Sequence, residues 1–185
     1  MLYKVLKADG TGFHEDRGCF GNGGWSMPHD GIPGDWMPEI EIEFNNQDDP
    51  DSGYLLVNEE HLVEHLGPHI RIFEAEGRGE NFDNAFHPGG MSYWSEARLM
   101  CELTPWNEEA AQHFAVDCAE HAQSEWASKA KNVYDAVYLA IRDVVKRAAK
   151  TDGEGAWGPA GLTAHAAEHA WQREQLVKYL RGETK

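Results

Sequence analysis

The chain has 185 residues, with 32 Asp and Glu against 16 Lys and Arg and a formal net charge of −16. This length is sufficient for one domain with a hydrophobic core, or for a domain with a helical extension, and the 41% of hydrophobic residues is typical of a folded protein. The negative charge argues against direct binding to nucleic acid or to acidic membranes, because both depend on Lys and Arg.

No apolar run in the sequence is long enough to cross a membrane, and its first residues lack the apolar region of a secretory signal. Its three cysteines, Cys19, Cys101 and Cys118, lack the C-x-x-C spacing of a zinc or redox motif. These features predict a cytoplasmic protein with reduced thiols and no contact with a membrane.

The first predicted elements are a strand at residues 2–7 and a long loop at residues 18–38. The strand shows alternation of apolar and polar residues. The loop is rich in Gly and Pro, but its aromatic residues, Trp25 and Trp36 among them, need other side chains to pack against. We therefore expect the loop to be ordered.

Residues 39–44, EIEIEF, alternate strictly and predict a further strand. One face would be apolar, and the other would carry Glu39, Glu41 and Glu43. Like charges in a row cost stability, so this face either is solvated and protects a sheet edge or meets a basic partner. The predicted turn that follows adds Asp48, Asp49 and Asp51.

The clearest unit spans residues 53–77 and is predicted to be a strand, a helix and a strand. A short apolar run at 54–57 predicts the first strand. Asn58 is a good helix cap, and Gly67 followed by Pro68 ends a helix. Apolar residues then predict a second strand over the rest of the unit, followed by a Gly-rich loop and a last strand.

The second half is predicted to be helical. Thr104 and Pro105 suit the N-cap and first position of a helix, whose apolar residues recur every four positions from Trp106 to Trp126, and Thr163 suits the cap of the last helix. The fold class is therefore α+β, a small and mainly antiparallel sheet with one helix followed by a C-terminal three-helix region. The predicted parts are a sheet domain at 1–103, a helical region packed on it at 104–150, a Gly-rich linker at 151–162 and a C-terminal helix at 163–185.

Two H-x-x-E-H motifs place pairs of histidines at the spacing of metal ligands on a helix. No third ligand is indicated by spacing, and histidines of a core or an interface explain the pattern as well. We predict no metal site, and the candidate ligands, if there is one, are His61, His65, His165 and His169.

Several short segments form an ordered series along most of the chain. They are Trp36-Met37-Pro38 with Ile40-Glu41, Gly53-Tyr54-Leu55, Leu62-Val63-Glu64 with Leu66-Gly67-Pro68, Glu96-Ala97-Arg98-Leu99, Trp106-Asn107-Glu108, Asp117-Cys118-Ala119-Glu120, and Ala170-Trp171-Gln172 with Tyr179-Leu180. The series resembles a domain-of-unknown-function family from actinobacteria and their phages. This resemblance implies no particular activity.

A looser likeness concerns the order of the elements: an opening strand, a Gly-Tyr strand, a helix, a strand, and a late strand with an acidic residue. This order is similar to that of the ADP-ribosyltransferase-like fold. The resemblance implies an enzyme that uses NAD, with Tyr54, Glu96 and Arg98 as its site residues.

The charge is unevenly distributed. Residues 1–125 contain 25 acidic and 6 basic residues, a net of −19, whereas residues 126–185 contain 7 and 10, a net of +3. Solubility or adaptation to salt explains such a charge, and so does a surface that attracts a basic partner. The candidate partner-binding residues are Glu39, Glu41, Glu43, Asp48, Asp49, Asp51, Glu59 and Glu60, with Trp25 and Trp36 as apolar anchors.

These observations lead to a first hypothesis and two alternatives. The first is a phage or mobile-element protein that acts without a cofactor in the host cytoplasm. Its acidic half would occupy the nucleic-acid groove of a basic host protein, as DNA-mimic, anti-restriction and anti-CRISPR inhibitors do. The alternatives are the NAD-using enzyme and a virion structural or assembly protein that oligomerises through its helices. The partner and the oligomeric state stay open.

Overall fold

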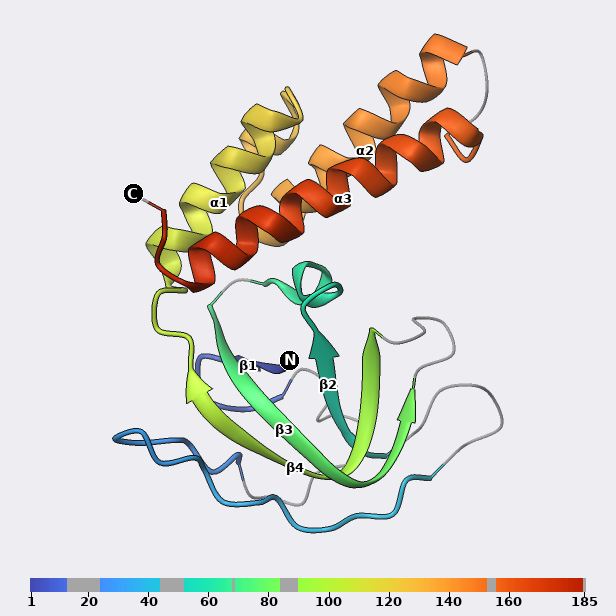
Figure 1. Cartoon of the computed structure of the whole chain (residues 1–185). Helices are drawn as coiled ribbons and strands as arrows, with labels where there is room; N and C mark the ends of the chain where they lie inside the picture. The colour runs from blue at the N-terminus through green and yellow to red at the C-terminus, as the bar shows by residue number, and fades with distance from the viewer. Residues whose placement is uncertain (13–23, 44–51, 68, 84–89, 153–155, 185) are drawn as a thin grey trace. The chain divides into compact units, whose positions relative to one another are not determined.

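The computed structural model describes residues 1–12, 24–43, 52–67, 69–83, 90–152 and 156–184 (Figure 1). The chain divides into two compact units. The first consists of Met1–Leu62 and His69–Thr104, and the second of Val63–Pro68 and Pro105–Lys185. The first unit contains all the named strands, and the second contains the α-helices.

The strands of the first unit close into a small antiparallel barrel in the order β1-β2-β4-β3. The long strands β3 and β4 pair along most of their length, and register shifts at Glu74/Ala75 and Arg78/Asn81 interrupt the pairing. Such bulges increase the local twist, which helps a sheet to curve and close. The strands are β1 (Leu2–Lys7), β2 (Tyr54–Asn58), β3 (Ile70–Asp83) and β4 (Met91–Glu102) (Figure 1).

The antiparallel sheet predicted from the sequence is confirmed, but the structure adds its closure and lengthens β3. We expected that strand to end near Gly77, where a Gly-rich loop was predicted, yet β3 continues to Asp83. Pairing of Asn81 and Phe82 with the first residues of β4 offsets the cost of the glycines in this stretch.

The barrel core combines inward residues of all four strands with two side chains from residues 24–43, the described segment before β2. Trp25 and Met37 are buried there, and Trp25 meets the ring of Tyr54 edge-on at 5.5 Å between centroids. The expected packing of aromatic loop residues is therefore confirmed for Trp25, whereas residues 13–23 lie outside the described residues. The cluster consists of Leu6, Trp25, Met37, Tyr54, Leu56, Phe73, Ala75, Ala97 and Leu99.

The segment that leads to the predicted strand at 39–44 follows one edge of β4. Gly34, Met37 and Ile40 donate backbone hydrogen bonds to the carbonyls of Leu99, Ala97 and Ser95, at 2.9, 2.8 and 3.0 Å. These donors are three residues apart, whereas those of a β-ladder are two apart. Residues 39–43 form no strand, so the prediction is wrong for them, and residue 44 lies outside the described residues. The predicted alternation of exposure nevertheless holds, because Ile42 is buried between exposed Glu41 and Glu43.

The helices of the second unit are α1 (Glu108–His121), α2 (Val133–Asp152) and α3 (Pro159–Leu180), with the short 3-10 turn η3 (Ala127–Lys129) before α2 (Figure 1). None of the helices in the described ranges combines the length and apolarity that crossing a membrane requires. The helix predicted within residues 53–77 is only the four-residue 3-10 helix η2 (Leu62–His65). Its apolar residues are buried as expected, but one turn is enough to bury them.

Two predicted helix starts are wrong by about a turn. The N-cap of α1 is Asn107, not Thr104, because its side chain accepts a hydrogen bond from the amide of Ala110 at 3.0 Å and two glutamates follow in the first turn. Helix α3 begins at Pro159, so Thr163 lies inside it and donates its hydroxyl to the Pro159 carbonyl at 2.8 Å. The expected linker at 151–162 is correspondingly shorter.

The core of the second unit is built around Phe114, which is fully buried. Its ring contacts Trp106 and Tyr179 edge-on, with centroids 5.9 and 5.6 Å apart. The predicted apolar stripe is confirmed where Trp106, Phe114 and Cys118 are buried. Trp126, at its predicted end, is 64% exposed because α1 ends at His121.

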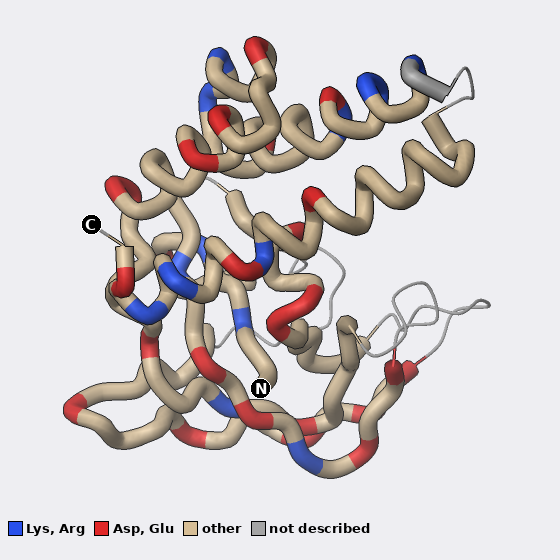
Figure 2. The backbone as a smooth tube through the Cα atoms, turned by 45° about the horizontal axis from the view of Figure 1, so that its top comes forward, with Lys and Arg blue, Asp and Glu red and all other residues tan. Residues whose placement is uncertain are grey.

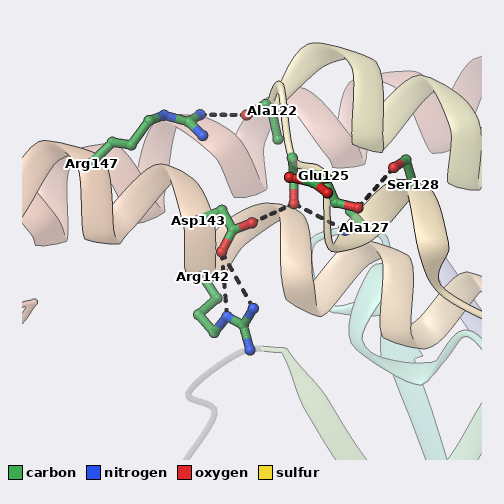
Figure 3. Close-up of polar contacts among 8 residues, drawn as sticks. Ala122, Glu125, Ala127, Ser128, Arg142, Asp143 and Arg147 are labelled. Atoms are coloured by element: carbon green, nitrogen blue, oxygen red, sulfur yellow. Dashed lines mark hydrogen bonds and ion pairs between the residues drawn. The ribbon is translucent and has the colours of Figure 1, made fainter.

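Polar contacts hold the connection between α1 and α2 (Figure 3). Arg147 of α2 donates to the carbonyl of Ala122, the C-cap of α1. The hydroxyl of Ser124 donates to Asp143 at 2.5 Å, and Arg142 lies 3.4 Å from the same carboxylate. The connection is thereby tied to α2 at two neighbouring turns.

Candidate protein-binding surface

The three glutamates at 39, 41 and 43 are exposed on a segment whose backbone is held in place. The hydroxyl of Ser52 accepts a hydrogen bond from the Glu43 amide at 2.6 Å and donates to the Glu41 carbonyl at 2.7 Å. Ile42, between them, is buried. In the part of the chain that the structure describes, Glu39, Glu41 and Glu43 form no ion pair, so their charges face solvent. We call these three residues the acidic row.

The other predicted acidic residues are less informative. Asp48, Asp49 and Asp51 lie outside the described residues, Glu59 is half-buried, and Glu60 is exposed. One predicted anchor needs a correction. Trp25 is only 6% exposed and belongs to the barrel core, so it is not an anchor for a partner.

Beside the acidic row, β3 and β4 carry reciprocal cross-strand ion pairs. The register places Glu76 opposite Arg98 and Arg78 opposite Glu96. The shortest nitrogen–oxygen distances are 2.7 Å for Arg98–Glu76 and 2.5 Å for Arg78–Glu96. The hydrogen bond from Arg78 lowers the pKa of Glu96 and the same contact raises the pKa of Arg78. The side chains of both pairs are solvent-accessible, so the two ion pairs contribute little to stability.

Trp36 covers this ladder. The guanidinium carbons of Arg78 and Arg98 lie 4.0 and 4.6 Å from the centroid of its ring. Stacking on an aromatic face and pairing with a carboxylate are both favourable for a guanidinium. Arg71 is likewise paired, with Glu102 at 2.6 Å. Each of the barrel arginines in the described ranges is therefore in an ion pair with a carboxylate. No member of the acidic row forms such a pair in these ranges, although the charge of Glu39 contributes to the raised pKa of Arg78.

The residues implied by the ADP-ribosyltransferase likeness do not form one exposed site. Tyr54 is 3% exposed, and its hydroxyl donates to the Pro38 carbonyl at 2.8 Å. Burial, and secondarily the charge of Glu96, raises the pKa of Tyr54. Glu96 and Arg98 belong to the ion-pair ladder. The use of NAD stays a prediction.

The candidate metal ligands have other contacts. His61 belongs to the first unit and His65 to the second, and the 3-10 turn there is not the helix that would align them. His169 contacts Glu64 at 3.2 Å, and its ring lies parallel to that of His165 with centroids 6.1 Å apart. Within the described ranges, no three His, Cys, Asp or Glu side chains are arranged to hold a metal ion.

The sequence analysis missed a buried polar cluster between α1 and α3. Glu168 is 3% exposed and Gln172 is fully buried. The carboxylate of Glu168 contacts Nδ1 of His121 at 3.0 Å and accepts from Nε2 of Gln172 at 3.0 Å. His121 also stacks on Trp171, with ring centroids 3.8 Å apart. The signal was present, because Glu168, Gln172 and Leu176 share one face of α3 at i, i+4 spacing.

A carboxylate that orients a histidine is also an arrangement used for proton transfer. A catalytic site would need a substrate cavity beside His121. One pocket of this unit lies nearer the N-terminal end of α1 and is lined by His113, Val116, Asp117, Tyr179 and Thr184. The cluster contributes to the packing of α3 on α1.

We predict different reactivities for the two described cysteines. Burial, followed by the hydrogen bond and charge of Glu74, raises the pKa of Cys101, whose sulfur lies 3.3 Å from that carboxylate. Burial raises the pKa of Cys118 still further. In a Cys19→Ser background near pH ~8.5, where a free thiol is half ionised, Cys101 will react slowly with a disulfide reagent and Cys118 will not react.

Glu74→Gln removes the charge that disfavours the Cys101 thiolate. The pKa falls, the thiolate fraction at a fixed pH rises, and the midpoint of the rate–pH profile shifts to lower pH. Glu76→Gln, two residues away with the same loss of charge, is the control and should leave the profile close to that of the parent. An unchanged or slower rate for Glu74→Gln would contradict this assignment.

No protein-family model, curated protein or solved structure matches this chain. The family resemblances inferred from short motifs therefore stay predictions.

Proposed function

We propose that this protein binds a basic, nucleic-acid-binding protein of a host cell through the acidic row and inhibits it as a DNA mimic. The observation that carries the proposal is the selective neutralisation of charge. The arginines of the barrel are paired with Glu76, Glu96 and Glu102, while the row at 39–43 has no such partner among the described residues. In Figure 2, the few basic positions of the barrel are surrounded by acidic positions.

The exposure of the row supports this partner class. Glu39, Glu41 and Glu43 are exposed at alternate positions while Ile42 is buried, so a line of negative charge is available to a basic groove. Half-buried Trp36 lies next to the row in the sequence and provides an aromatic surface, which is common at protein interfaces. Attraction between a basic groove and this row would be sensitive to salt.

The test is a pull-down from an actinobacterial lysate, with washes of rising salt in the presence and absence of DNA. We expect capture of a protein that itself binds nucleic acid, and its release by salt and by DNA. Glu39→Lys, Glu41→Lys and Glu43→Lys together should reduce its capture at least about tenfold, because every contact of the row becomes repulsive.

The matched control reverses Glu80, Asp83 and Glu120 to Lys, which are exposed acids outside the row. It makes the same change in net charge. Equal loss of capture in both triple variants would show that net charge, rather than the row, is responsible. Full capture by the row variant, or capture that DNA does not reverse, would refute the proposal. The NAD-using enzyme and the virion protein stay predictions without a specific observation in their favour.

A further inference from the structure

Helix α2 carries one row of exposed side chains that the proposed function does not use. Positions 134, 138, 142, 146 and 150 succeed one another at i, i+4 spacing, so they follow one ridge of the helix. Tyr134 and Tyr138 are 49% and 58% exposed, and Lys146 and Lys150 are exposed. Arg142, between them, is half-buried and contacts only the adjacent Asp143 at 3.4 Å in the described structure. We call these five residues the α2 row.

The α2 row has no acidic member, in a chain of net charge −16. Its basic end lies in the last turns of α2, where Figure 2 shows blue positions next to the grey residues 153–155. Exposed tyrosines followed by arginine are a composition typical of protein interfaces, whereas isolated lysines alone are not. An anionic protein surface is therefore the partner that fits the basic end of the row.

The acidic row of the first unit is the complement of the basic end of this ridge. Lys146 and Lys150 are exposed and lie one helical turn apart, about 6 Å along the helix axis. Glu39, Glu41 and Glu43 are exposed and form no ion pair in the part of the chain that the structure describes. Arg142 is half-buried and paired with Asp143, so the two lysines carry the positive charge of the contact.

We infer that the α2 row of one copy docks on the acidic row of a second copy. The contact is heterologous, since it joins different surfaces, and it produces a closed ring or an open chain. The charge distribution favours it, because residues 1–125 carry −19 and residues 126–185 carry +3. This contact uses the same acidic row as the proposed host partner and competes with it, but it is tested on the purified chain alone, so its failure would leave the host-partner proposal untouched.

Salt decides whether this contact can be observed. Two copies of such negative charge repel one another at long range, but at about 0.1 M salt the Debye length is only about 10 Å, so contacts at ion-pair distance are favoured over distant repulsion. At about 1 M salt, where the Debye length is about 3 Å, the docking charges are screened as well. Self-association should therefore be present at the first salt concentration and weakened at the second.

The experiment is sedimentation velocity of the full chain over a wide range of concentrations. We expect the mean mass to rise with concentration at moderate salt and to fall in high salt. Lys146→Glu with Lys150→Glu, and separately the triple Glu39, Glu41 and Glu43→Lys variant, should each weaken association about tenfold or more. An equimolar mixture of the two variants should regain it, because each charge-reversed surface meets its complement on the other chain.

Two controls make the outcome decisive. Lys129→Glu with Lys131→Glu changes the net charge equally but alters exposed residues before α2, so it should associate like the parent. Tyr134→Ala with Tyr138→Ala should weaken association without a change in charge. A parent chain that is monomeric at every concentration, or a mixture that does not recover, overturns the inference. Single-stranded DNA that binds the parent and not the Lys146/Lys150 variant would assign the α2 row to nucleic acid instead, and also overturns it.

Discussion

Phe114→Ala will lower the free energy of unfolding of the helical unit by about 3–5 kcal/mol. The side chain is fully buried and meets Trp106 and Tyr179 edge-on, so its loss leaves a cavity bordered by two large rings. Urea denaturation followed by far-ultraviolet circular dichroism measures the effect, because this unit contains the α-helices.

Val116→Ala on the same helix is the matched control. Val116 is 53% exposed, so this change should alter the free energy of unfolding by less than about 0.5 kcal/mol. If both variants unfold at the same urea concentration, Phe114 is not at the centre of a packed core and the arrangement of α1 against α3 is different from that described.

Gly34→Ala is expected to detach the segment that carries the acidic row. A Cβ at this position would lie 2.0 Å from the carbonyl oxygen of Ser26, a backbone atom that cannot rotate away. The strain should cost about 1–3 kcal/mol. The strained residue, Gly34, also donates the first hydrogen bond of the segment to β4, at 2.9 Å to the Leu99 carbonyl. We expect lower thermal stability of the barrel and weaker capture of a basic partner.

Gly24→Ala is the control for this change, since a Cβ there has nothing within 4 Å. It should be neutral, or stabilising by about 0.4–1 kcal/mol through the unfolded chain. Thermal unfolding monitored by tryptophan fluorescence, together with the pull-down, distinguishes the Gly34→Ala variant from the Gly24→Ala variant. Equal behaviour of the two alanine variants would mean that Gly34 does not hold the segment against β4.

The acidic row and the buried cluster differ in how visible they are in the sequence. The alternation of EIEIEF correctly predicted that the three glutamates are exposed and that Ile42 between them is buried, because apolar and charged residues differ in the cost of burial whether or not the segment joins a ladder. The cluster of Glu168, Gln172 and His121 was not predicted. Polar residues at buried helical positions are uncommon, so Glu168 and Gln172 were expected to be exposed.

The sequence by itself determined the local elements and the charge. Strand β1 was predicted with its observed bounds, and the strand predicted at 54–57 is β2, which ends one residue later. Three helices were expected in the second half, and its described residues form three α-helices. These features depend on periodicity, capping residues and composition, which act over a few neighbouring positions.

Only the tertiary structure decided which of these residues are available for function. Closure of the barrel buried Trp25 and Tyr54, while Trp36 came to lie over two arginines that pair across β3 and β4. The register between strands and the approach of α3 to α1 bring together residues far apart in the sequence. Their contacts depend on long-range packing and on which charges meet a partner, and neither is encoded in the spacing of residues within one segment.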